Sequence, residues 1–236
     1  MARRALRSGR LWVFVATIGV ALPTALVLAP AALHYDDIRR LAHQPPPSTA
    51  FMDARTNGSR PNGGLAHTWV DYERISPALA RAVVVAEDAR FVDHDGIDWD
   101  AVSRAFQRNW SDAGIVRGGS TITQQLAKNL YLSERRSYLR KAQEAALALL
   151  LEQSLGKRRI LELYLNYIEW GDGVFGAEAA ARHYYGVSAA HLAAHQAARL
   201  AARIPRPRYY DRVGATNYLR ERSAQIKGWM PNARVP

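Results

Sequence analysis

The stretch that decides the fold class is YLRKAQEAALALLLEQSLGKRRILELYLNYI, which runs from Tyr138 to Ile168. Its apolar residues recur at the three- and four-residue spacing of a helix. We therefore expect a long helix over Tyr138–Leu155 that stops at Gly156, because glycine commonly follows a helix end. A second helix is expected directly after it, over Arg158–Ile168.

Helical patterns continue on both sides of this stretch. Ser76 followed by Pro77 is a helix N-cap with proline at the first helical position, so one helix should begin there. Asp98 or Asp100 can cap the next helix, which should run toward Trp110. Further helices are expected from Ser120 through Leu130, from Phe175 to Tyr185 and from Ser188 to Ile204. We find no convincing run of alternating strand residues, so the pattern predicts an almost all-helical (all-α) fold.

Composition limits the possible functions. The chain has 236 residues, of which 48% are apolar, and this is enough for a sizeable core. It contains no cysteine, which excludes disulfides and thiolate metal sites. Its formal net charge of +11 favours a polyanionic partner, which could be a nucleic acid, an anionic membrane surface or a phosphorylated substrate.

The N-terminal segment has the composition of a membrane anchor. Residues 1–10 hold four arginines and no acid, and Leu11–Leu33 holds no charged residue. Because about 20 apolar residues cross a bilayer as a helix, we expect a cytoplasmic basic tail over 1–10 and a transmembrane helix over 11–33. The arginines then place the rest of the chain outside the cytoplasmic membrane. The alternative is a cleavable signal peptide, with Ala29-Pro30-Ala31 as its cleavage site, and it also exports the remainder.

The exported part is expected to consist of a linker and one domain. Residues 44–64 are rich in Pro, Gly, Ser and Asn, as linkers are. We therefore assign residues 34–64 to a linker and residues 65–236 to a single folded domain.

The stretch EDARFVDHDGID, from Glu87 to Asp98, follows the end of an apolar helix. A carboxylate at that position feels the negative end of the helix dipole and partial desolvation, and both raise its pKa. A general base that works near neutral pH needs such a pKa. From this stretch alone, solvated cap residues explain Glu87 and Asp88 better, since exposed acids at helix ends are common.

The stretch GGSTITQQLAKN, from Gly118 to Asn129, places two glycines before a capped helix. Free backbone N–H groups at such a helix start suit an anion. Ser120, Gln124 and Lys128 fall on one helix face, which is polar but carries little charge. This pattern favours a surface that faces carbohydrate or phosphate.

The stretch RRSYLRKAQE, from Arg135 to Glu144, concentrates cations. Arg136 and Arg140 are like charges one helical turn apart, and Lys141 lies beside them. Glu144 can pair with one of these cations, but a pyrophosphate explains the whole cluster better.

These stretches, together with KRRILELYLNYIEWGDGVFGAEAAARHYYG, resemble in order and spacing the peptidoglycan glycosyltransferases of glycosyltransferase family 51. The chain is similar to the monofunctional transglycosylases of that family, which are related to the N-terminal module of bifunctional penicillin-binding proteins. The resemblance implies a helical, lysozyme-like, two-lobed domain. It also implies polymerisation of lipid II into β-1,4-linked glycan strands, with release of the lipid pyrophosphate in a single inverting displacement.

The resemblance assigns roles to individual residues. It implies that Glu87 is the general base and that Glu144 is the second essential glutamate. Lys128, Arg136, Arg140 and Lys141 would offset the charge on the departing pyrophosphate, with a divalent cation such as Mg²⁺ or Mn²⁺. Glu144 would position either these cations or the metal, and no set of metal ligands is assigned. The residues expected to bind the substrate are Asp88, Phe91, His94, Gly119, Ser120, Thr121, Gln124, Gln125, Lys128, Asn129, Arg136, Arg140 and Lys141.

The sequence also departs from the family pattern. Relatives often carry an acid where this chain has His195 or Gln196, in a helix that we interpret as structural. Some relatives have a lysine in place of Gln143, so one pyrophosphate contact can be missing. The segment Trp110–Val116 either dips into the membrane, as it does in relatives, or is an ordinary loop.

Two other classes of function compete with this interpretation. A lysozyme-like hydrolase would cleave glycan strands, but it needs no cluster of pyrophosphate-binding cations. A basic binding protein for membrane or nucleic acid would interleave its cations with aromatic residues, and here they lie among polar helix faces. The expected partners are lipid II, the growing strand and the cytoplasmic membrane, and no nucleic acid; cell-division or elongation proteins stay open as further partners.

Overall fold

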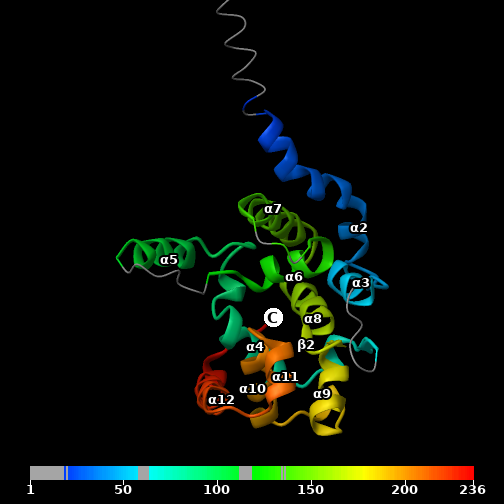
Figure 1. The fold of residues 1–236 in the computed structure, drawn as a ribbon, viewed down its shortest axis with the longest axis vertical. Helices are drawn as coiled ribbons and strands as arrows, with labels where there is room; N and C mark the ends of the chain where they lie inside the picture. The colour runs from blue at the N-terminus through cyan, green and yellow to red at the C-terminus, as the bar shows by residue number, and fades with distance from the viewer. Residues whose placement is uncertain (1–18, 20, 58–63, 112–118, 134, 136) are drawn as a thin grey trace, which may run out of the picture.

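The computed structural model describes residues 19, 21–57, 64–111, 119–133, 135 and 137–236, and it is mainly helical (Figure 1). The helices are α2 (Tyr35–Arg40), α3 (Ala50–Asn57), α4 (Pro77–Glu87), α5 (Trp99–Ser111), α6 (Ile122–Tyr131), α7 (Tyr138–Ser154), α8 (Lys157–Tyr167), α9 (Ala177–Tyr185), α10 (Ala194–Arg203), α11 (Pro207–Val213) and α12 (Asn217–Trp229). Short 3₁₀ turns cover Tyr72–Arg74, Phe91–Asp93, Ala189–His191 and Met230–Asn232. The mainly helical fold class is confirmed.

The helices form two groups that α8 connects (Figure 1). In the first group, α6 packs against α7 and α8, and α2 packs against α7. In the second group, α10 packs against both α4 and α12. The first group lies at the end of the molecule that carries the N-terminal helix, and the second group lies at the opposite end. The core runs through both groups, with Trp170, Tyr164 and Phe91 among its fully buried side chains.

A small sheet is present that the sequence pattern did not predict. Its strands are β1 (Ala66–His67), β2 (Glu169–Gly171) and β3 (Val174–Phe175), in the order β1-β3-β2. Strand β3 pairs in parallel with β1 and antiparallel with β2. Strands of two or three residues are too short to give a recognisable alternation.

One expected helix boundary next to this sheet was wrong, and one expected helix farther along the chain is divided. Phe175 belongs to β3, and α9 begins only after Gly176, whose φ of +83° is outside the helical region. A Cβ atom on Gly176 would lie 2.5 Å from the Asn166 carbonyl oxygen, so the chain passes too close for any side chain there. The expected helix over Ser188–Ile204 is divided into a 3₁₀ turn and α10.

The start of α6 lies one residue later than expected. Thr121, and not Ser120, is its N-cap: Thr121 Oγ1 accepts a hydrogen bond from the Gln124 N–H, and Gln124 Oε1 accepts one from the Thr121 N–H, both at 3.1 Å. This reciprocal pair satisfies two N–H groups at the helix start. Ser120 is thereby left outside the helix with its side chain exposed.

The segment expected to be a linker, 34–64, contains α2 and α3 and contributes to the core. Ile38, Leu41 and Met52 are buried in it. Their burial comes from packing with distant elements, because α2 contacts α7 and α3 contacts α6, and a linker-like composition does not report such contacts. Within the described residues, this segment is therefore folded structure.

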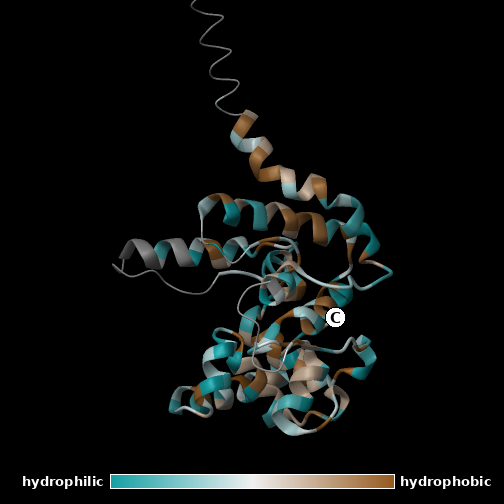
Figure 2. Ribbon diagram, turned by 45° about the vertical axis from the view of Figure 1, so that its right-hand side comes forward, coloured by the Kyte–Doolittle hydropathy of each residue, from teal (hydrophilic) through white to brown (hydrophobic). Residues whose placement is uncertain are grey.

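The expected basic tail, 1–10, lies outside the described residues, as do 11–18 and 20 of the expected anchor. Residues 21–33 are helical, and Figure 2 shows apolar residues in brown along this helix. Leu22, Leu26, Leu28 and Leu33 on it are exposed. Among the residues that the structure describes, no helix is both long and apolar enough to cross a membrane. Most of Trp110–Val116 also lies outside the described residues.

Asn166 connects α8 to the segment that leads into α4. Its side chain is fully buried, with Oδ1 accepting from the Val70 N–H at 3.0 Å. Its Nδ2 donates to the carbonyl oxygens of Val70 and Glu162, each at 2.9 Å. A single amide therefore satisfies both backbone groups of Val70, which is itself buried.

We expect Asn166→Leu to lower the free energy of unfolding by about 2–4 kcal/mol, because it leaves the buried N–H and C=O of Val70 without partners. Chemical denaturation of the purified variant measures this loss. The matched control is Asn217→Leu, since Asn217 is exposed at the start of α12; its effect should stay within about 0.5 kcal/mol. Equal losses in the two variants would contradict the role given to Asn166.

Candidate active site

Glu87 is the last residue of α4, and its side chain is only partly exposed. Burial raises the pKa of Glu87 above its usual value, and the neighbouring charge of Asp88 raises it further. A hydrogen bond from Gln125 and the positive charges of Arg222 and Lys128 act in the opposite direction. The raised pKa makes this carboxylate a better proton acceptor near neutral pH.

Two hydrogen bonds in series connect Glu87 to Gln125 and Gln125 to Tyr164. Gln125 Nε2 donates to Glu87 Oε2 at 2.8 Å. The Tyr164 hydroxyl donates to Gln125 Oε1, also at 2.8 Å. Because Gln125 lies on α6 and Tyr164 lies on α8, three helices meet at this carboxylate.

Asp88 joins the end of α4 to the start of α6. Its buried carboxylate accepts a hydrogen bond from the Ile122 N–H at 3.0 Å. His94 Nε2 lies 3.0 Å from both of its oxygens. The helix start that the sequence suggested for an anion is thus occupied, within the protein, by the carboxylate of Asp88.

Two cavities meet at Glu87. The larger has a volume of about 870 Å³ and the smaller about 240 Å³, and Glu87, Gly119 and Ser120 line both. The larger cavity is also lined by Gln125 and by residues of α10, α11 and α12, and the smaller by Arg90, Asp98 and Arg104, among others. A carboxylate between two cavities can contact groups of two substrates at once.

An ion cluster around the buried Glu144 lies on α7, beside the cleft that the two cavities form at Glu87. Glu144 is 3% exposed, and Arg140 Nη1 donates to its Oε2 at 2.8 Å. Lys141 Nζ donates to Glu144 Oε1 and, at 2.8 Å, to the Ser120 hydroxyl. Since Ser120 lines both cavities, Lys141 carries positive charge to the edge of the cleft.

The structure brings together part of the predicted site. Glu87, Gly119, Ser120 and Gln125 share the larger cavity, and Thr121 and Asp88 line the smaller one. Arg140, Lys141 and Glu144 join this group through the Ser120 hydroxyl. Lys128 contributes positive charge to Glu87, and its Nζ lies 5.2 Å from the centre of the Phe51 ring. Arg136 lies outside the described residues.

Other predicted residues support the site without facing it. Phe91 is fully buried, and it packs edge-on against His94, with the two rings 6.4 Å apart. Gln124 is used in the cap of α6, and Asn129 Nδ2 donates to the Gln125 carbonyl at 2.8 Å. Direct contact with a substrate is therefore not expected of Phe91, because it has no exposed surface.

The residues that depart from the family pattern have structural contacts. Gln196 Oε1 accepts a hydrogen bond from the Ala193 N–H at 2.9 Å at the start of α10, which fits the structural role expected for this helix. His195 is exposed. Gln143 Nε2 donates at 2.9 Å to the carbonyl of Leu26, so it faces the N-terminal helix.

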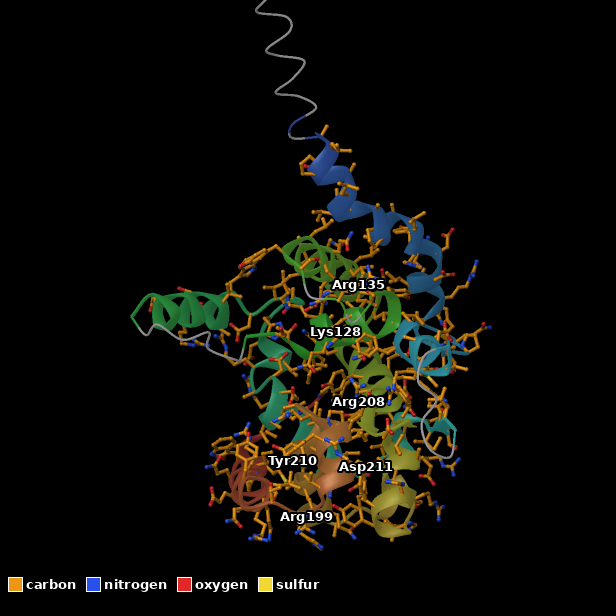
Figure 3. All side chains as sticks on the ribbon, in the orientation of Figure 1. Lys128, Arg135, Arg199, Arg208, Tyr210 and Asp211 are labelled. Atoms are coloured by element: carbon orange, nitrogen blue, oxygen red, sulfur yellow. The ribbon has the colours of Figure 1, made fainter. Side chains whose placement is uncertain are left out.

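The sequence pattern missed the opposite wall of the larger cavity. This wall comes from the end of the chain and combines cations with aromatic rings: Arg206, Tyr209, Tyr210, Tyr218 and Arg222. Figure 3 shows Tyr210 in the group of α10, α11 and α12, and Lys128 in the group of α6 and α7, so the cavity lies between the two groups. The dense run of arginine and tyrosine over 206–212 was an available signal.

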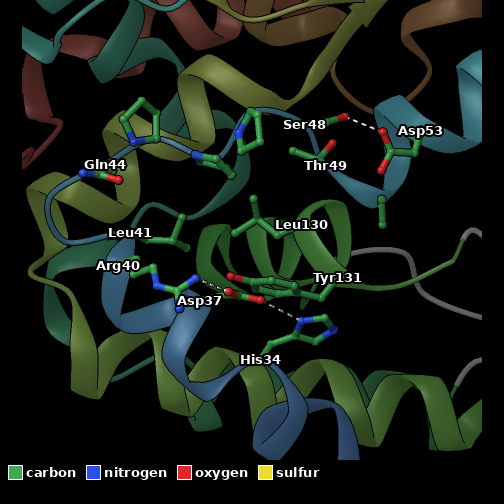
Figure 4. A pocket seen from close by; sticks show the side chains of 14 residues that line it. His34, Asp37, Arg40, Leu41, Gln44, Ser48, Thr49, Asp53, Leu130 and Tyr131 are labelled. Atoms are coloured by element: carbon green, nitrogen blue, oxygen red, sulfur yellow. Dashed lines mark hydrogen bonds and ion pairs between the residues drawn. The ribbon is translucent and has the colours of Figure 1, made fainter.

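A further cavity of about 530 Å³ lies between α2, α3 and α6 (Figure 4). None of the predicted site residues lines it. Its Asp37 is paired with Arg40 at 3.1 Å, and its Asp53 accepts a hydrogen bond from Ser48. The candidate catalytic residues therefore lie at the two cavities beside Glu87 and not in this one.

Comparisons with known proteins identify relatives over most of the chain. The family described as Transglycosylase matches residues 57–230. A biosynthetic peptidoglycan transglycosylase of Bordetella avium is 52% identical over 202 residues, which cover 83% of this chain and 84% of the relative. A protein of the same name from Methylobacillus flagellatus is 54% identical over 194 residues, 81% and 85% of the two chains. One from Janthinobacterium sp. is 48% identical over 220 residues, 92% and 95% of the two chains.

We expect Glu87→Gln to raise the thermal stability of the detergent-solubilised protein at neutral pH. The pKa of Glu87 is raised on folding, so the stability that its protonated form contributes is complete below the unfolded pKa and is lost as pH rises through the folded pKa. The variant should therefore melt above the wild type at pH 7–8, and the two melting temperatures should converge toward about pH 4. A difference that does not change with pH would contradict the assignment.

Proposed function

The chain belongs to the transglycosylase family, and from this premise we propose that it is a peptidoglycan glycosyltransferase that joins lipid II units into β-1,4-linked glycan strands. The observation that carries the proposal is the position of Glu87 where two cavities meet, with a raised pKa. One cavity would hold the growing strand and the other the incoming lipid II.

Glu87 acts as the general base in this proposal. It accepts the proton of the acceptor sugar's 4-hydroxyl, and that oxygen forms a bond to the anomeric carbon of the donor. The bond from this carbon to the lipid pyrophosphate breaks, and its electron pair leaves on the pyrophosphate. A single displacement converts the α-linked donor into a β-linked product.

The cations of α6 and α7 stabilise the leaving group in this proposal. Lys141 and Arg140 hold Glu144, and Lys141 also reaches Ser120 at the edge of the cleft. Charge that develops on a pyrophosphate in the transition state is stabilised by donors that are already in place. Glu144 keeps the two cations together, because without it two like charges would repel at close range.

A lysozyme-like hydrolase fits these observations less well. Hydrolysis of a glycan strand has no pyrophosphate leaving group, so it gives no reason for Lys141 to approach the cleft. The family and the names of the relatives point to strand synthesis.

The expected divalent cation, Mg²⁺ or Mn²⁺, is not matched by a protein site. Both oxygens of Glu144 are bound by cationic side chains, and among the described residues no group of three His, Asp or Glu side chains could hold an ion. The cation would therefore arrive with the pyrophosphate of the substrate.

The membrane location is part of the same proposal. The apolar sequence over 11–33 and the exposed leucines of its described part support a single-pass anchor in the bacterial cytoplasmic membrane, with the catalytic domain outside. An anchor of this kind keeps the enzyme beside a lipid-linked substrate. Proteins of cell division or elongation would be met on the same side, and no nucleic acid partner is proposed.

We expect the solubilised wild type to polymerise labelled lipid II in the presence of Mg²⁺, and Glu87→Gln to lower the rate about 10²–10⁴-fold, because the general base is lost. The matched control is Glu73→Gln, which makes the same chemical change at an exposed glutamate outside both cavities. Cutting of preformed strands without polymer formation would favour the hydrolase. Full activity of Glu87→Gln would refute Glu87 as the base.

We expect EDTA to lower the rate of lipid II polymerisation, while added Mg²⁺ leaves the melting temperature of the substrate-free protein unchanged. A cation that binds with the substrate pyrophosphate stabilises only the complex, since stabilisation requires binding to the folded protein. Calorimetry with and without Mg²⁺ checks this. A rise in melting temperature with Mg²⁺ alone would show a protein-held site.

A further inference from the structure

Tyr164 lies under the active site without facing it. Its side chain is fully buried, and it lines neither of the two cavities at Glu87. Its hydroxyl donates at 2.8 Å to Gln125 Oε1, and no role in the mechanism above uses it. A buried hydroxyl that bonds a cavity residue can act on the site only through that residue.

The bond from Tyr164 fixes which way the Gln125 amide points. The hydroxyl donates its single hydrogen to the carbonyl end of the amide, and this contact favours that orientation over the flipped one, in which the phenol oxygen could only accept and its hydrogen would lose this acceptor. The amino end is then the one that faces Glu87, and it donates to Oε2 at 2.8 Å. In the opposite orientation the amide oxygen would face a carboxylate, and two acceptors would repel.

The surroundings of Tyr164 keep this hydroxyl a donor. Burial raises the pKa of Tyr164 well above its usual value, and the charges of Glu87 and Asp88 raise it further. The hydroxyl therefore stays protonated across the working pH range. The backbone of Gln125 is held as well, since its carbonyl accepts a hydrogen bond from Asn129 at 2.8 Å.

We propose that Tyr164 is a positioning residue for the reaction: through Gln125 it orients the carboxylate of Glu87 and stabilises its charged form. The inference rests on the proposed function, in which Glu87 is the general base. A charge-assisted hydrogen bond to a carboxylate favours its ionised state. Without the Tyr164–Gln125 bond, Gln125 is no longer held in the orientation that donates to Glu87, so the Glu87 carboxylate should ionise only at higher pH.

The test is the pH dependence of lipid II polymerisation by Tyr164→Phe in the full-length, solubilised protein. A general base is active above its pKa, so loss of the bond should move the acidic limb of the kcat profile to higher pH. We expect a shift of about one unit, equivalent to an about tenfold lower rate on that limb. The rate should recover at high pH, and KM should change little because Tyr164 does not line the cavities.

The matched control is Tyr167→Phe. Tyr167 lies on the same helix, is 1% exposed, and donates its hydroxyl to the Pro46 carbonyl, away from Glu87. The acidic limb of the kcat profile of Tyr167→Phe should coincide with that of the wild type. A profile for Tyr164→Phe that is lowered equally at every pH, or that matches Tyr167→Phe, would overturn the proposal.

If Tyr164→Phe fails to fold, Gln125→Met removes the hydrogen bond to Glu87 directly and should shift the limb in the same direction. An unshifted limb then overturns the proposal. Failure of the proposed function gives a different result. In that case Glu87→Gln would still polymerise lipid II, whereas failure of the positioning role alone leaves Glu87→Gln inactive and the limb of Tyr164→Phe unshifted.

Discussion

The carboxylate of Asp88 binds two elements at once, the start of α6 through the Ile122 N–H and the turn after α4 through His94. A charged group at a buried position needs several partners, and here these partners belong to segments that are separated along the chain. Because Asp88 follows Glu87 directly, the same contact fixes the end of α4 against α6. The approach of Gln125 to Glu87, and the position of Ser120 beside the cleft, both depend on this junction.

Glu87 and Asp88 are adjacent in the sequence, but their carboxylates have different surroundings. The oxygens of Asp88 are bonded to protein donors, and Asp88 lines only the smaller cavity, whereas Glu87 lines both cavities. Desolvation of Glu87 disfavours its charge in the folded protein, so this position opposes stability while it favours proton transfer. The Gln125 hydrogen bond limits that effect, and it keeps the carboxylate in one orientation.

The cleft depends on both groups of helices. The α6–α7 group contributes Gln125 and, through Lys141 and Ser120, positive charge. The α10–α12 group contributes a wall of arginine and tyrosine side chains, and Arg222 donates to the Ala86 carbonyl at 3.2 Å, next to Glu87. A cavity lined by cations and aromatic rings suits a ligand that combines sugar rings with negative charge.

The sequence by itself determined the helical fold class, the cap at Ser76 and the helical grouping of Arg140, Lys141 and Glu144, because these features depend on residues a turn apart. The resemblance in its motifs, which extended along the chain, also identified the family. Only the tertiary structure decided which carboxylate is bonded to Gln125, that the expected linker enters the core, and that the end of the chain closes the cleft. Glu87 and Gln125, for example, are 38 positions apart along the chain. Residue spacing along one helix shows which face is apolar, but it does not show which distant element packs on that face.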